Sequence, residues 1–335
     1  MFENYTVEYI EKDQVKKREK AEKFLNKLGL KYDEGVDITI VLKNNDEILG
    51  TISAEDNLIK CMGINQNHRN EGILNKLVSE IIKFKYSQNI FELSVITGIC
   101  NKDKLKSLGF YEIYSTENIV LMENSKYKFQ NYIKKIEEHK NKNNKNNAAV
   151  VMNLNPITKG HLYLIEKASK ENDFVYIFVV SEDKSEIPFE VRFELAEKST
   201  QHLKNVKIIE GGDYIISSST FPSYFTKTYN DWVENYCDLD LNIFGKYISK
   251  TLNIKKRYIG SEPYCSLTSY YNKKIHKILP KYNVEIEEVE RLANKDEVIS
   301  ASKVRKLAKE SKFDILKELV PVPTYRYLKS KRRTL

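Results

Sequence analysis

The run FVYIFVV at residues 174–180 is the feature that most limits the fold of this chain. A strand this apolar has to be buried on both faces, and it lies between two amphipathic stretches, GHLYLIEKASK and FEVRFELAEKSTQHL. The strand-like AAVVMNLN comes before these segments and NVKIIEG after them. Apolar strands that alternate with amphipathic helices indicate a parallel sheet with helices on both faces. We therefore predict a doubly wound, Rossmann-like sheet, in which ligands bind where the strand order reverses.

The N-terminal part of the chain has a different pattern. A helix is expected over residues 14–28, and three short β-branched runs then follow, separated by turn-like NND and EDN. A second amphipathic helix, the strand FELSVIT, a short helix and two closing strands complete this part. The pattern predicts an α+β domain with a mainly antiparallel sheet.

A segment without apolar residues, EEHKNKNNKNN at residues 137–147, divides the two patterns. We expect domains at residues 1–125 and 148–335, joined by a helix and a Lys/Asn-rich linker at residues 126–147.

The formal charge is +8, but the 55 basic residues are interleaved with 47 acidic ones, so no nucleic-acid partner is expected. The four cysteines lack metal-ligand spacing, so no metal site is expected. No signal peptide or membrane span is recognisable, so a cytoplasmic location is expected.

The segment VMNLNPITKGH, residues 151–161, joins the first strand of the predicted parallel sheet to its first helix. A phosphate at this position would meet main-chain N–H groups and the positive end of a helix dipole. Gly160 permits close approach of a ligand, Thr158 supplies a hydroxyl, and His161 can donate a ring N–H. Donors aimed at the α-phosphate of ATP would stabilise the charge that develops there. The alternative is that Thr158 only caps the helix.

A second element, ISASKVR at residues 299–305, also ends a loop and opens a helix. It places two hydroxyls, those of Ser300 and Ser302, and the cation of Arg305 at another helix start. Its alternative interpretation is an ordinary serine cap followed by a solvated arginine. The two motifs in this order around a parallel sheet favour a nucleotide site.

T-x-G-H near one end of the sheet and I-S-x-S-x-V-R near the other resemble the HxGH nucleotidyltransferases. By this resemblance His161 and Thr158 would stabilise the transition state at the α-phosphate, and Ser300, Ser302 and Arg305 would hold the β- and γ-phosphates. Many members read G-x-F-D-P-x-H-x-G-H, whereas this chain has a hydroxyl at the first histidine position. The other departures are Met152, Leu154 and Asn155 at the Gly, Phe and Asp positions.

The sequence is similar to the citrate lyase ligase family in four places: the motif N-P-x-T-x-G-H and the segments SEDKSEIPFEVRFELA, YIGSEPYCSLTSYYN and ISASKVRKL. The resemblance implies that acetate attacks ATP to give acetyl-adenylate and pyrophosphate. The thiol of the phosphoribosyl-dephospho-coenzyme A arm on the citrate lyase acyl carrier subunit would then take the acetyl group. The nucleotide site that we assign on this basis contains Asn153, Asn155, Gly160, Gly260, Ser300, Ser302 and Arg305.

Other groups in this half are candidates for the remaining contacts. Lys159 and Arg192 are candidates for binding anionic groups of the substrate, and residues 217–229, SSSTFPSYFTKTY, for the pocket of the two-carbon acid. Mg²⁺ is expected with ATP, held mainly by phosphate oxygens and water.

The element order of the N-terminal half is similar to the GNAT acetyltransferase fold. Arg69 and Gly72 stand where that fold has its pyrophosphate-binding glycine-rich loop, and Leu108-Gly109-Phe110 resembles its late L-G-F turn. Because Asn70 and Leu74 replace two glycines, our hypothesis is that this domain recognises the coenzyme A-like arm or the carrier protein.

Two other functions remain open at this point. One is a nucleotidyltransferase that joins a nucleotide to a phosphorylated metabolite, with an independent acetyltransferase in front. The other is a regulator that binds ATP without catalysis. Exchange of labelled pyrophosphate into ATP, tested with and without acetate, distinguishes these functions.

Overall fold

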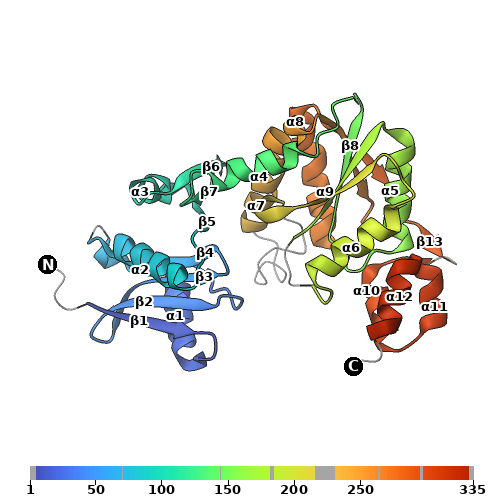
Figure 1. Ribbon diagram of the computed structural model, residues 1–335. Coiled ribbons are helices and arrows are strands. Elements are labelled where there is room, and N and C mark those ends of the chain that lie inside the picture. Colours follow the sequence, from blue (N-terminus) through green and yellow to red (C-terminus); the bar gives the residue numbers. More distant parts are fainter. Residues whose placement is uncertain are drawn as a thin grey trace. The chain divides into compact units, whose positions relative to one another are not determined.

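The computed structural model describes residues 5–69, 71–143, 145–181, 185–215, 231–262, 265–294 and 297–331. The chain forms two compact units. The first comprises Met1–Asn131 and Pro222–Asn235, and the second comprises Tyr132–Phe221 and Tyr236–Leu335. Figure 1 labels the helices and strands of both.

The first unit contains a seven-stranded sheet in the order β1-β2-β3-β4-β5-β7-β6. Every neighbouring pair is antiparallel except β4 and β5, which confirms the predicted α+β domain with a mainly antiparallel sheet. The first strand was not foreseen from the sequence. The strands are β1 (Tyr5–Glu11), β2 (Ile38–Asn44), β3 (Glu47–Glu55), β4 (Leu58–Ile64), β5 (Ser94–Gly98), β6 (Tyr111–Ser115) and β7 (Ile119–Glu123).

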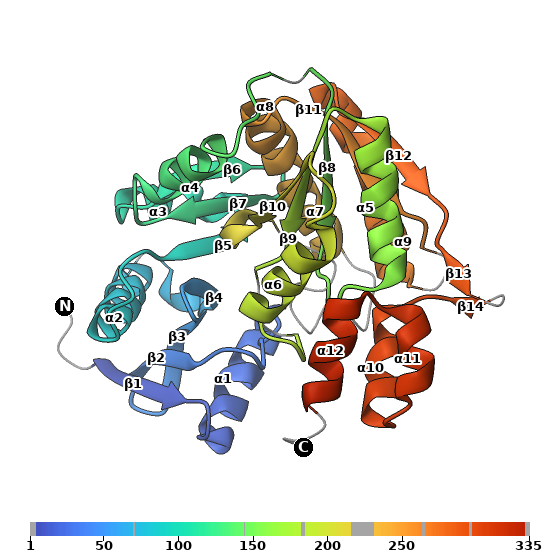
Figure 2. The ribbon, with the colours of Figure 1, turned by 45° about the vertical axis from the view of Figure 1, so that its right-hand side comes forward.

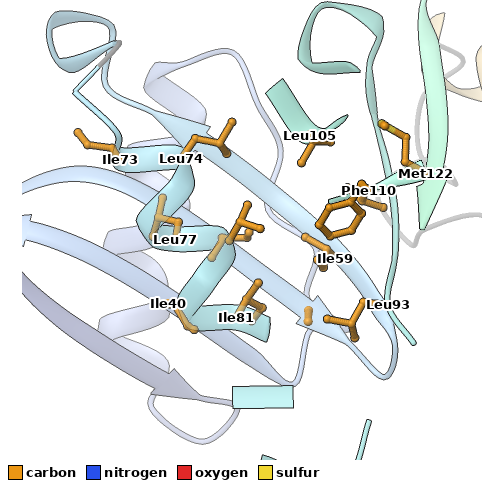
Figure 3. Packing of buried hydrophobic residues seen from close by; sticks show 14 of the residues in the cluster. Ile40, Ile59, Ile73, Leu74, Leu77, Ile81, Leu93, Leu105, Phe110 and Met122 are labelled. Carbon is orange, nitrogen blue, oxygen red and sulfur yellow. The ribbon is translucent and has the colours of Figure 1, made fainter. Parts of the chain in front are cut away.

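Helix α2 (Ile73–Ser87) supplies much of the core of this unit. Its apolar residues recur at helical spacing, and Figure 3 shows Leu77 and Ile81 directed toward the strand side chains Ile40 and Ile59. Burial of each such side chain contributes about 1.5–3 kcal/mol, so this face fixes the helix on the sheet. The other helices are α1 (Val15–Lys27) and α3 (Lys102–Ser107).

The second unit contains a five-stranded sheet in the order β10-β9-β8-β11-β12. All four neighbouring pairs are parallel, which confirms the predicted doubly wound sheet. The order reverses beside β8, so the chain leaves β8 and β11 toward helices on opposite faces. The strands are β8 (Asn147–Met152), β9 (Phe174–Val179), β10 (Val206–Glu210), β11 (Ile254–Gly260) and β12 (Glu285–Val289); β13 (Ala293–Asn294) and β14 (Glu297–Val298) form a separate two-residue pairing.

Helices cover both faces of this sheet (Figure 2). Helices α5 (Lys159–Glu171) and α6 (Phe189–Thr200) share one apolar cluster with Val150, Ile177 and Tyr258 of the strands. On the other face, Phe244 packs edge-on against Phe178 of β9 at 6.0 Å between ring centroids. The elements on that face are α7 (Asp231–Ile243), which belongs to this unit from Tyr236 onward, the π-helical turn η5 (Phe244–Ile248), α8 (Ser249–Thr251) and α9 (Ser266–Ile278).

Four further helices lie outside these layers. Helix α4 (Lys128–Glu137) corresponds to the helix expected before the Lys/Asn-rich segment. Helices α10 (Ala301–Lys309), α11 (Phe313–Leu319) and α12 (Val322–Lys331) pack together at the end of the chain (Figure 2). Among the described residues, no helix combines the length and the apolar character needed to span a membrane.

Candidate active site

A cavity of about 640 Å³ lies at the carboxyl ends of β8, β11 and β12, beside the point where the strand order reverses. Its size is that of a small-molecule site, and its position is the one expected for a doubly wound sheet. The structure brings most of the sequence-predicted residues of the second unit to this cavity. Those in its wall are Asn153, Asn155, Thr158, Gly160, His161, Gly260, Ser300, Ser302 and Arg305.

Thr158 and His161 form a reciprocal cap at the start of α5. The Thr158 hydroxyl accepts from the main-chain N–H of His161 at 3.3 Å, and the main-chain N–H of Thr158 donates to His161 Nδ1 at 3.1 Å. The Thr158 hydroxyl also lies 3.0 Å from Nδ1. The capping role weighed for Thr158 is therefore present, and it also fixes the orientation of the imidazole.

The protonation state of His161 follows from this cap. Burial of the ring, and to a smaller extent the positive charge of Arg291, lower the pKa of His161 to about 4. The imidazole is therefore neutral near pH 7. Because a main-chain N–H can only donate, Nδ1 is an acceptor and the ring proton is on Nε2. Nε2 has no hydrogen-bond partner among the described residues, so its N–H is available to a ligand in the cavity.

Arg192 holds the loop that leads from β8 to α5. Its side chain is 0% exposed, and its guanidinium donates to the main-chain oxygens of Asn153, Val180 and Ile187 at 2.7–3.0 Å. It also donates to Asn153 Oδ1 at 2.8 Å. Arg192 is neither at the surface nor in the cavity wall, and it contacts the site through Asn153.

Arg305 joins the second motif to the same loop. Its Nη1 donates to the main-chain oxygen of Asn155 at 2.6 Å, and its Nε lies 3.2 Å from Oε1 of Glu186. Ser300 caps α10, because its hydroxyl accepts from the main-chain N–H of Lys303 at 3.2 Å. The starts of α5 and α10 thus meet at one cavity.

The two glycines of the cavity wall have different surroundings. A methyl group added to Gly160 would lie 3.5 Å from the main-chain oxygen of Ile299, so the turn of the first motif lies directly against the second. A methyl group added to Gly260 would have no atom within 4 Å. Lys159, the first residue of α5, is half-buried and is not part of the cavity wall.

Charged residues of the cavity wall that were not predicted from the sequence include Arg291, Glu262 and Arg257. Arg291 donates from Nε to the main-chain oxygen of Ser261 at 2.7 Å and forms an ion pair with Glu262. Arg257 lies within β11 and is 3% exposed. These residues are separated in sequence from both motifs, and Arg257 is part of the surface-like run KKR, so no local signal distinguishes them.

The predicted residues of the first unit lie at the start of α2. Arg69 is exposed, and Gly72 occupies the N-cap position with φ +76°, a conformation that favours glycine. The segment expected to bind the two-carbon acid, residues 217–229, lies outside the described residues. The described residues contain no group of three or more His, Cys, Asp or Glu side chains arranged to hold a metal ion.

Comparison with known proteins shows to which family the chain belongs. Residues 147–328 match the family model described as the citrate lyase ligase C-terminal domain. The chain is 32% identical to the citrate pro-3S-lyase ligase of Escherichia coli (strain K12), over 98% of this chain and 95% of that protein. It is 35% identical to the enzyme of that name from Haemophilus influenzae, over 93% of this chain and 95% of that protein.

Among solved structures, Thermotoga maritima TmcAL bound with alpha-thio ATP is similar at 11% identity and a TM-score of 0.41, with 56% of each chain covered. The family match and the two relatives, each aligned over almost its whole length, lead to the same assignment. This chain belongs to the citrate lyase ligase family.

Proposed function

We propose that this protein activates citrate lyase by ATP-dependent acetylation of the thiol on its acyl carrier subunit. Membership of the citrate lyase ligase family supports the overall reaction. The observation that carries the proposal for this chain is the meeting of two capped helix starts, at Thr158 and Ser300, in one cavity of the parallel sheet.

In the first step, a carboxylate oxygen of acetate attacks the α-phosphorus of ATP. A carbon–oxygen–phosphorus linkage forms, the bond from the α-phosphorus to the bridging oxygen breaks, and pyrophosphate leaves with the electron pair. His161 Nε2–H and the α5 N-terminus would donate to the α-phosphate, where negative charge develops. Ser300, Ser302 and Arg305 would bind the β- and γ-phosphates, and Asn153, Asn155 and Gly260 would complete the nucleotide site.

His161 suits this role because it is neutral and its orientation is fixed. The ring donates through Nε2 without having to gain or lose a proton. Preorganised donors need no reorganisation during the reaction, which is why they stabilise a transition state effectively. Neither His161 nor Thr158 acts as a nucleophile in this mechanism.

In the second step, the sulfur of the carrier thiol attacks the acetyl carbonyl carbon and a carbon–sulfur bond forms. The bond from that carbon to the oxygen of the adenylate breaks, AMP leaves with the electron pair, and the thiol proton passes to water. We propose that the GNAT-like domain, residues 1–125, binds the coenzyme A-like arm or the carrier protein through the loop that contains Arg69 and Gly72. The helix and Lys/Asn-rich segment of residues 126–147 would connect it to the catalytic domain, residues 148–335.

Magnesium would enter as part of the MgATP substrate. The acidic residues of the cavity wall include Glu186 and Glu262, and each forms an ion pair with an arginine. We expect the ion to be held mainly by phosphate oxygens and water. The ion would neutralise charge on the phosphates and on departing pyrophosphate.

Exchange of labelled pyrophosphate into ATP tests the first step. We expect exchange that depends on acetate and does not require the carrier protein. A series of small carboxylates in the same assay measures the selectivity for the acid. Exchange driven by a phosphate-bearing acceptor and indifferent to acetate would instead identify a nucleotidyltransferase. Binding of ATP without exchange under any condition would indicate a regulator.

A further inference from the structure

Arg257 is a buried cation with hydrogen-bond donors that no described residue uses. It is 3% exposed and lies in the wall of the cavity. Its Nε and Nη1 are closed to solvent and have no hydrogen-bond partner among the described residues. Buried guanidinium groups normally donate to carbonyl or carboxylate oxygens, because burial without such partners costs free energy. Arg192 of the same unit, which donates to four oxygen atoms, is the ordinary case.

Neighbouring side chains fix the position of this guanidinium. Its carbon lies 4.6 Å from the centre of the Phe244 ring, and Phe244 packs against Phe178. Within the sheet, Arg257 of β11 is paired with Ala149 of β8. Asn153, where the loop to α5 begins, is four residues further along, or about 13 Å at 3.3 Å per residue. Arg257 therefore lies at the inner end of the cavity, beneath the two helix starts.

A buried carboxylate, Asp240, and Arg257 both act on the hydroxyl of Tyr271. Asp240 is 2% exposed and accepts a hydrogen bond from the hydroxyl of Tyr271. Burial and Asp240 raise the pKa of Tyr271, and the positive charge of Arg257 opposes this shift, so both charges act on the same hydroxyl. A ligand with one negative charge can use the guanidinium donors, whereas a triphosphate would bring an excess of negative charge into the interior.

We propose that Arg257 binds the carboxylate of the acid substrate at the inner end of the cavity. This inference rests on the proposed function, because it assigns the acid of that reaction to a residue. A planar guanidinium presents parallel N–H groups that match the two oxygens of a carboxylate. The phosphate groups would remain at the starts of α5 and α10, where main-chain N–H groups and helix dipoles face the cavity.

This arrangement also positions the acid for attack. A carboxylate held by Arg257 is separated from bulk water, and one oxygen can be directed toward the α-phosphate while the other remains bound. No proton is transferred in this step, so the positive charge of Arg257 is constant throughout. Arg257 would thereby set the apparent affinity for the acid and contribute little to that for ATP.

The test compares Arg257→Gln and Arg257→Lys with the full-length protein. Acetate-dependent pyrophosphate exchange gives the KM for acetate, and equilibrium dialysis with MgATP gives the Kd for ATP. We expect Arg257→Gln to raise the KM for acetate roughly 30-fold or more, as for loss of one partner of a buried charge pair, and to change the Kd for ATP less than threefold. Arg257→Lys should recover part of the loss, because it keeps the charge without the planar fork.

Arg326 offers a matched control, because it is exposed on α12 outside the cavity wall. Arg326→Gln should leave the KM for acetate and the Kd for ATP unchanged. Thermal unfolding of each variant shows whether it is folded. If Arg257→Gln does not fold, Arg257→Lys replaces it in the comparison. An unchanged KM for acetate in a folded variant, or a parallel loss of ATP affinity, would overturn the inference.

Direct binding separates this inference from the proposed function. If the unmodified protein shows no carboxylate-dependent exchange, the proposed function is wrong, and the Arg257 site is tested by ¹³C NMR line broadening of labelled acetate. Broadening by the unmodified protein and by Arg326→Gln, weaker broadening by Arg257→Lys and none by Arg257→Gln would support the site. Equal broadening by all of them, or none by any, would refute it. Acetamide, a neutral molecule of the same size, should not compete.

Discussion

The main-chain N–H of Thr158 donates to Nδ1 of His161 at 3.1 Å, and the Thr158 hydroxyl accepts from the main-chain N–H of His161 at 3.3 Å. This pair caps α5 and also determines which nitrogen of the imidazole bears the proton. A single local interaction thus links the start of a helix to the chemistry proposed at the α-phosphate, and it leads to the first two predictions.

Replacement of His161 by alanine should reduce acetate-dependent pyrophosphate exchange roughly 100- to 1,000-fold, the usual effect of removing one transition-state donor. The protein should remain folded, as measured by circular dichroism. His202, which is exposed and bonded to Glu166, gives the matched control. His202→Ala should exchange at the normal rate. Retention of exchange by folded His161→Ala would show that the assigned donor is wrong.

The free energy of unfolding should depend on pH through His161. Its pKa is lowered to about 4 in the folded protein, from an ordinary value near 6.5. Between these values the unfolded chain binds a proton that the folded protein does not, so stability falls as pH decreases from 6.5 to 4. The contribution is up to about 3 kcal/mol, at 1.36 kcal/mol per pKa unit.

Denaturant titrations at several pH values measure this contribution as the difference between the unmodified protein and His161→Gln. The difference in free energy of unfolding should change in this window and become constant above about pH 7. A difference that does not vary with pH would contradict the assigned neutral state.

Arg192 is predicted to be a positioning residue. Its replacement by methionine should lower the free energy of unfolding by at least about 2 kcal/mol, because the buried oxygens of Asn153, Val180 and Ile187 lose their donor. If the loop is positioned by Arg192, the KM for ATP should also rise in the folded variant. A purely structural role would lower stability and leave the KM for ATP unchanged. Arg192→Lys should have a free energy of unfolding and a KM for ATP between those of the unmodified protein and Arg192→Met.

Gly72 gives a test of the proposed role of the first unit. Gly72→Ala introduces a side chain at φ +76°, at a cost of about 1–2 kcal/mol, and alters the turn that follows Arg69. Pyrophosphate exchange should continue, whereas the rate of carrier acetylation should fall. Gly29→Ala is the matched control, since Gly29 has φ +72° with open space around it. Equal carrier acetylation by both variants would argue against a role for this loop.

Removal of divalent cations should affect activity and stability differently. EDTA should abolish pyrophosphate exchange, because the charge of the ATP phosphates is no longer neutralised. The melting temperature without ATP should not change, because Mg²⁺ is expected to enter with ATP and to be held mainly by its phosphate oxygens and water. A fall in melting temperature on addition of EDTA would reveal a structural metal and contradict this view of Mg²⁺ as part of the substrate.

The sequence by itself determined the parts of the protein that depend on local patterns. The apolar run of β9 between two amphipathic helices predicted the parallel sheet, and the meander of β2, β3 and β4 was also recognisable. Both helix starts of the candidate site were found because capping is a property of a few consecutive residues. Strand β1 was missed, although its pairing with β2 completes the edge of the first sheet.

Only the tertiary structure decided which charged side chains are buried and what they contact. Arg192 and Arg257 lie in segments that look ordinary in the sequence, yet Arg192 donates to four oxygen atoms and Arg257 donates to none among the described residues. The difference arises from residues far away in the chain, such as Asn153 for the first and Phe244 for the second. Burial and electrostatics depend on what surrounds a side chain in three dimensions, and the spacing of residues along the chain does not encode that environment locally.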